Sequence, residues 1–238
     1  MKTGAIILSI LAVFAILVGC SNYTNISKTT EVVTIRDITD MMTVTPKVDD
    51  ITPLFDLQKE KWNGGIFRFV DLSDVSYNRT HEVNIEAENQ WLSNEFARND
   101  AVKTFYSDIN KTLSDSSKVT VGKNNSSLYF PIATELNRLS QSHANKRIML
   151  IYSDLMENTE SISFYKKGTL TKLTTNSDSI KEQFELHMKL GSLNGIIIYL
   201  IYQPVNTTDD EKYRIVSNFY KHLFESYGAS VEITANVN

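Results

Sequence analysis

The sequence predicts an α/β fold: a doubly wound, mainly parallel sheet of six strands, with one antiparallel edge strand and helices on both faces. Two observations predict it. Short runs of apolar and β-branched residues alternate with longer segments in which apolar residues recur every three or four positions. The runs at 147–154 and 195–202 are also almost continuously apolar, as expected for parallel strands covered on both faces. Alternation of this kind is typical of a parallel sheet between two helix layers.

The first half of the chain is expected to supply three strands and two helices. The β-branched run within 31–41 predicts the first strand, and 49–57 a short helix. Polar turn residues separate the strands expected at 66–72 and 81–87, so these two are predicted to pair antiparallel. A long amphipathic helix is expected at 89–113. Its predicted buried face consists of Leu92, Phe96, Val102, Phe105, Ile109 and Leu113.

The second half continues the alternation of strands and helices through the two apolar strands. It begins with a polar loop at 114–127, which contains a short extended piece at 119–121. Helical spacing and cap residues predict three helices, and period-two alternation predicts the last strand. The expected elements are a helix at 128–143, an irregular strand at 161–165, helices at 177–190 and 209–227, and a strand at 230–237.

The N-terminal segment has the pattern of a secretion signal. Lys2 precedes an apolar run at 5–18 that is too short for a stable membrane span. The run ends in Leu-Val-Gly-Cys, which resembles the bacterial lipobox and contains the only cysteine of the chain, Cys20. This resemblance implies a signal peptide at 1–19, lipidation of Cys20, and a protein anchored in the cell envelope, periplasmic or surface-exposed. Residues 20–30 are then a tether and 31–238 one domain.

Composition and spacing exclude several classes of function. The net charge of −4, without a basic cluster, argues against nucleic acid as a partner. The four histidines are scattered, without the spacing of a zinc site. The chain has neither a phosphate-binding glycine loop nor a Gly-x-Ser-x-Gly elbow, so we do not expect an enzyme.

Carboxylates and hydroxyls follow two predicted strands. Asp37 and Thr39 come at the end of the first strand, and Asp154 ends the strand at 147–154. The carboxyl ends of parallel strands meet at one sheet edge, where open α/β sheets bind ligands. Carboxylate and hydroxyl oxygens suit a hard cation, so Mg²⁺, or Mn²⁺ or Ca²⁺ in its place, is the expected cofactor.

With these residues, the chain resembles a von Willebrand factor A-type (VWA) domain. That family often carries a metal-ion-dependent adhesion site (MIDAS) made of Asp-x-Ser-x-Ser after the first strand, a Thr before a middle helix and an Asp after the fourth strand. Asp37 and Thr39 match the first two motif positions, and Met41 replaces the last Ser. Asp154, in Tyr-Ser-Asp-Leu, matches the final position.

The Thr of the family's second loop corresponds to Ser126 or Ser127, and the spacing to the following helix favours Ser126. An alternative register would begin the domain at Ile66 and use Asp71, Ser73 and Val75 as the motif. It leaves no segment for the neighbours of the first strand, so it ranks second.

The resemblance implies a lipoprotein that presents a VWA-like domain to a protein partner, through a degenerate divalent-metal site. Two alternatives remain open. One is a metal-dependent envelope hydrolase that uses Asp37 and Asp154, and the other is a structural scaffold with a non-functional metal site.

Overall fold

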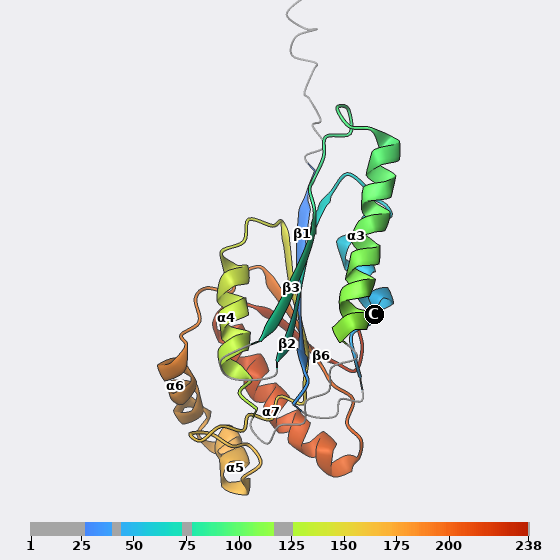
Figure 1. Cartoon of the computed structure of the whole chain (residues 1–238). Coiled ribbons are helices and arrows are strands. Elements are labelled where there is room, and N and C mark those ends of the chain that lie inside the picture. The colour runs from blue at the N-terminus through green and yellow to red at the C-terminus, as the bar shows by residue number, and fades with distance from the viewer. Residues whose placement is uncertain (1–26, 40–43, 73–77, 117–125, 238) are drawn as a thin grey trace, which may run out of the picture.

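The computed structural model describes residues 27–39, 44–72, 78–116 and 126–237 (Figure 1). The predicted signal peptide, Cys20, Met41, Ser73, Val75 and the extended piece at 119–121 lie outside these ranges. Among the helices that the structure describes, none is long and apolar enough to cross a membrane.

Six strands form one sheet in the order β3-β2-β1-β4-β5-β6. All neighbouring pairs are parallel except β2 and β3, which run antiparallel at one edge. This arrangement confirms the predicted fold class, and the order is that of doubly wound, Rossmann-like sheets. The strands are β1 Thr29–Asp37, β2 Gly64–Leu72, β3 Arg79–Ile85, β4 Lys146–Tyr152, β5 Ile196–Ile201 and β6 Ser230–Thr234.

Helices cover both faces of the sheet (Figure 1). Side chains of a strand alternate between the faces. Val33 and Ile35 of β1 therefore pack under α4, α5, α6 and α7, whereas Val32 packs under α2, the 3-10 helix η1 and α3. The helices are α2 Val48–Ile51, η1 Thr52–Phe55, α3 Glu95–Ser116, α4 Tyr129–Ser140, α5 Lys167–Thr175, α6 Ser177–His187 and α7 Thr207–Ser226.

Two predicted elements differ from the structure. Helix α3 begins at Glu95, not at 89, and the predicted core residues Leu92 and Phe96 are 87% and 83% exposed. The predicted strand at 161–165 is reduced to a single bridge at Ser163. Helix α5, just after it, was not predicted, because it has too few apolar residues to show a helical period.

A buried ion-pair cluster joins the sheet to α4. The guanidinium of Arg68 on β2 is 2% exposed and lies 2.9 Å from Glu31 Oε1 and 2.7 Å from Glu135 Oε2. Because a buried charge without a partner is costly, these contacts fix α4 against the strands. Helix α4 begins beside the ends of β1 and β4, so this packing positions its N-terminus for the site described next.

Candidate functional site

The predicted site residues lie at the carboxyl ends of β1 and β4, in the middle of the sheet. These strands are neighbours, and the chain builds the sheet outward from them in opposite directions. The point where the strand order reverses is the usual ligand site of an open α/β sheet, since the connecting loops diverge there. The fold therefore places the candidate residues at the expected position.

Four side chains meet there, which we call the strand-end cluster: Asp37, Thr39, Ser126 and Ser153. Thr39 donates to Asp37 Oδ1 from its backbone nitrogen at 2.8 Å and from Oγ1 at 2.6 Å. The hydroxyls of Thr39 and Ser126 share a hydrogen bond of 3.0 Å. Ser153 donates to Asp37 Oδ2 at 3.1 Å. The Asp37 carboxylate, only 2% exposed, thus accepts from Thr39 and from the distant Ser153, and Ser126 joins the cluster through Thr39.

The structure distinguishes between the two serine candidates. Ser126 joins the cluster through its side chain, and its backbone pairs with Asn158 in the loop after β4. Ser127 instead lines a neighbouring cavity of about 540 Å³, together with Tyr129 and Phe184. Of the two serines, Ser126 is therefore the one whose side chain joins the strand-end cluster.

Asp154 lies in a tight turn after β4. Its Oδ1 accepts the Met156 N–H at 2.9 Å, and Ser153 Oγ accepts the Leu155 N–H at the same distance. Leu155 has a φ of 61°, in the left-handed region that costs a non-glycine residue roughly 1–2 kcal/mol. The two side-chain acceptors hold this conformation, which keeps the Asp154 carboxyl, 8% exposed, at the strand end.

Glu157, at the end of the same turn, is a site residue that the sequence analysis missed. It is 3% exposed, and its Oε2 accepts the N–H groups of Leu128 and Tyr129, both at 2.9 Å, at the start of α4. Burial raises its pKa to about 7; the two N–H bonds oppose the rise and the nearby Asp37 adds to it. No local pattern signals this role, because the partners lie about thirty residues earlier in the chain.

Two tyrosines of α7, Tyr213 and Tyr220, lie near the acidic groups. Burial raises the pKa of both phenols, with Asp154 contributing at Tyr213 and Glu157 at Tyr220. Among the described residues, the buried Tyr213 hydroxyl has no hydrogen-bond partner. Three buried carboxyls, Asp37, Asp154 and Glu157, thus share this end of the sheet with a hydroxyl that can still bond a ligand or water.

The donor set of the strand-end cluster fits a hard divalent cation. Over the described ranges, no three His, Cys, Asp or Glu side chains converge as a metal site. The cluster is of another kind, with one carboxylate and three hydroxyls linked by contacts of 2.6–3.1 Å. Oxygen ligands of this type suit Mg²⁺, Mn²⁺ or Ca²⁺, whereas Zn²⁺ prefers nitrogen and sulfur.

The alternative register is disfavoured by the surroundings of Asp71. Arg36 binds this carboxylate through Nε at 2.9 Å and through its terminal nitrogen at 2.8 Å, and Ser116 donates to its other oxygen. The side chain of Asp71 is 3% exposed. An arginine held this closely satisfies the carboxylate as a structural ion pair.

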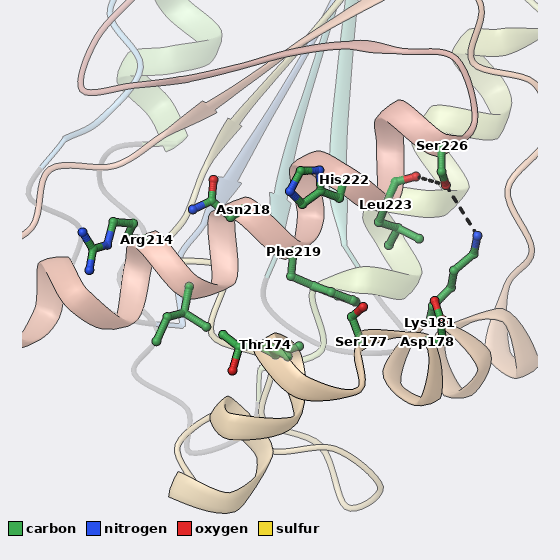
Figure 2. A pocket seen from close by; sticks show the side chains of 12 residues that line it. Thr174, Ser177, Asp178, Lys181, Arg214, Asn218, Phe219, His222, Leu223 and Ser226 are labelled. Carbon is green, nitrogen blue, oxygen red and sulfur yellow. Dashed lines mark hydrogen bonds between the residues drawn. The ribbon is translucent and has the colours of Figure 1, made fainter.

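A second hollow, of about 470 Å³, lies between α7 and the α5–α6 pair (Figure 2). Lys181 and Arg214 flank it, and Phe219 and Leu223 form part of its floor. Lys181 Nζ donates across it to Ser226 Oγ at 3.5 Å. None of the predicted site residues lines this hollow, so it is separate from the strand-end cluster.

Compared with models of known protein families and with curated proteins, the chain gives no significant match. Its function must therefore be argued from its own residues.

Proposed function

We propose that the protein is a lipoprotein, anchored in a bacterial cell envelope through Cys20, that presents a VWA-like domain to a protein partner. In this proposal the strand-end cluster is the docking site and a divalent cation completes it. The observation that carries the proposal is that Thr39 and Ser153 both bond the buried carboxylate of Asp37, and that Ser126 joins them through the Thr39 hydroxyl.

The direction of β1 supports a binding role. The described chain enters at Ser27, beside the first residue of β1, and Asp37 ends this strand. Nine extended residues place the two ends about 25 Å apart. An anchor at Cys20 would therefore leave the strand-end cluster on the side of the domain that faces away from the membrane, where a partner has access.

The cluster's own residues suggest how docking would work. Asp37, Thr39, Ser126 and Ser153 would hold the cation, with Asp154 on the adjoining turn. When bound, the cation supplies positive charge that can receive a carboxylate of the partner. Ser153 and the Thr39 backbone N–H orient the Asp37 carboxylate beforehand, so little rearrangement is needed when the ion enters.

Site-specific photocrosslinking in the cells that produce the protein tests this function. Ser127 directly follows Ser126 of the cluster, lines the neighbouring cavity, and makes no side-chain hydrogen bond within the described structure. A benzoylphenylalanine at this position is expected to crosslink a discrete partner. The same probe at Asn218, an exposed α7 residue beside the other hollow, is the matched control and is expected to give no such product.

Adding Asp37→Asn, or chelating divalent ions with EDTA, is expected to abolish the Ser127 crosslink. Crosslinking that persists in full under both treatments would contradict a docking site organised by Asp37.

A further inference from the structure

Three large apolar side chains lie exposed together just before and within the first turn of α3. Trp91, Leu92 and Phe96 are 86%, 87% and 83% exposed. We call them the apolar tip. Soluble proteins rarely expose several large apolar side chains in one place, and where they do, the patch usually marks a contact surface.

The backbone of the apolar tip is fixed by its own polar residues. Asn89 Oδ1 accepts the Trp91 N–H at 2.9 Å, and Asn89 O accepts the Leu92 N–H at 3.0 Å. Asn94 Oδ1 caps α3 by accepting the Phe96 N–H at 2.9 Å. These bonds hold the three side chains outward on a defined turn.

A buried arginine ties this turn to the domain. Arg98, 1% exposed, donates to the main-chain oxygens of Lys61 at 2.6 Å and Glu86 at 2.8 Å, and also to that of Asn63. The fold thus uses a fully buried guanidinium to position a turn that buries none of its own large side chains. Exposure of the tip is therefore a built feature and not a frayed end.

The apolar tip lies where the chain enters the domain. Ser27 Oγ donates to the backbone oxygen of Glu88 at 2.6 Å, and Gln90 lines one hollow with Ser27 and Lys28. Figure 1 shows the turn before α3 at the same end of the molecule as the start of β1, opposite the end that carries α5 and α6. The tip is thus next to the point from which the chain leads back to the predicted anchor.

The distance to that anchor is short. Ser27 follows Cys20 by seven residues, and a fully extended chain reaches at most about 25 Å over that length. If Cys20 carries lipid, the end of the domain with the apolar tip must stay within this reach of the bilayer surface.

We propose that Trp91, Leu92 and Phe96 insert into the interfacial layer of the bilayer that holds the Cys20 lipid. This inference rests on the anchor in the proposed function. Tryptophan and other amphipathic aromatics favour the headgroup region, and apolar neighbours add burial in the acyl boundary. Lys61 beside the tip is already ion-paired with Glu95, so we expect apolar burial to carry the contact, even on zwitterionic lipid.

Insertion would give the domain a second membrane contact and a fixed orientation relative to the bilayer. The tip end would rest on the bilayer, and the strand-end cluster, at the other end of β1, would point outward.

Depth-dependent fluorescence quenching tests the proposal on the mature lipoprotein, purified from membranes and reconstituted into phosphatidylcholine vesicles with or without brominated acyl chains. The chain has two tryptophans, so Trp62→Phe leaves Trp91 as the only reporter. We expect its emission to be strongly quenched by the brominated lipid. Adding Leu92→Ser and Phe96→Ser is expected to reduce this quenching.

The matched control moves the reporter to the opposite end. Leu186 on α6 is 86% exposed, as exposed as Trp91. In a chain carrying Trp62→Phe, Trp91→Phe and Leu186→Trp, we expect emission that brominated lipid leaves unchanged.

Vesicle flotation in the same samples distinguishes this proposal from the anchor. Protein that floats with the vesicles while Trp91 is quenched no more than the position-186 reporter would overturn insertion and leave the anchor intact. If the tip is unquenched and chemical crosslinking of the same samples joins two copies of the protein through it, membrane insertion is overturned. The tip would then contact a second copy of the chain. Protein that neither floats nor carries lipid at Cys20 would remove the anchor, and this inference with it.

Discussion

Replacing Glu157 by Gln is expected to change how stability depends on pH. The folded protein holds the Glu157 proton up to a pKa of about 7, whereas the usual value is 4.5. Between these two values, rising pH removes the proton from the unfolded chain before it leaves the folded one. The free energy of unfolding therefore falls as pH rises through this window, and stays lowered above it.

The size of this effect follows from the width of the window. One pH unit of differential protonation corresponds to about 1.4 kcal/mol. The interval from 4.5 to about 7 thus amounts to about 3 kcal/mol. Glu157→Gln keeps an oxygen that can accept the Leu128 and Tyr129 N–H groups but has no titrating proton. We expect the variant to have the same free energy of unfolding as the wild type near pH 4.5. At pH 8 its free energy of unfolding should be higher than that of the wild type by up to about 3 kcal/mol.

Urea denaturation followed by circular dichroism, at intervals from pH 4.5 to 8, measures this difference. Glu160→Gln is the matched control, since Glu160 belongs to the same loop but is exposed. If the free energies of unfolding of Glu157→Gln and of the wild type differ by the same amount across the whole pH range, the reasoning is refuted.

Two further changes test the fold that carries the site. Arg68→Met leaves Glu31 and Glu135 buried without the guanidinium that pairs with them. We therefore expect urea denaturation to show a free energy of unfolding lower by about 3–5 kcal/mol, and an unchanged urea midpoint would contradict this account. Gly228 has a φ of 97°, which alanine adopts only with strain, so Gly228→Ala should destabilise the fold by more than about 1 kcal/mol. Gly168 lies in α5 with open space around it, so Gly168→Ala should not destabilise the fold. Equal melting midpoints for the two variants would be inconsistent with this.

Much of the fold could be predicted because its signals are local. Runs such as 147–154 bury both faces and so lack polar alternation, and the polar turn before 79–85 signals the antiparallel pair. The start of α3 could not be predicted from spacing alone. Leu92 and Phe96 have helical spacing, but Asn89 and Asn94 bind nearby N–H groups and so delay the helix to Glu95.

The candidate site was predictable in part, for a related reason. Asp37, Thr39 and Asp154 stand at strand ends, a position that the sequence reveals directly. Ser153 and Glu157 gain their roles from partners elsewhere in the chain, the Asp37 carboxylate and the N-terminus of α4. Such contacts depend on the packing of distant segments, and no short motif encodes them.

The central claim is that the strand-end cluster binds a divalent cation, and a thermal melt tests it most directly. The purified protein is melted in EDTA and in excess Mg²⁺, alongside Asp37→Asn. The control is Asp178→Asn, an exposed aspartate at the start of α6. A ligand at one hundred times its dissociation constant adds about 2.7 kcal/mol, which raises the midpoint by several degrees in a domain of this size.

We predict that Mg²⁺ raises the midpoint of the wild type and of Asp178→Asn, but not that of Asp37→Asn. Identical wild-type midpoints in EDTA and in saturating Mg²⁺, Mn²⁺ or Ca²⁺ would contradict the claim and favour a scaffold without a metal.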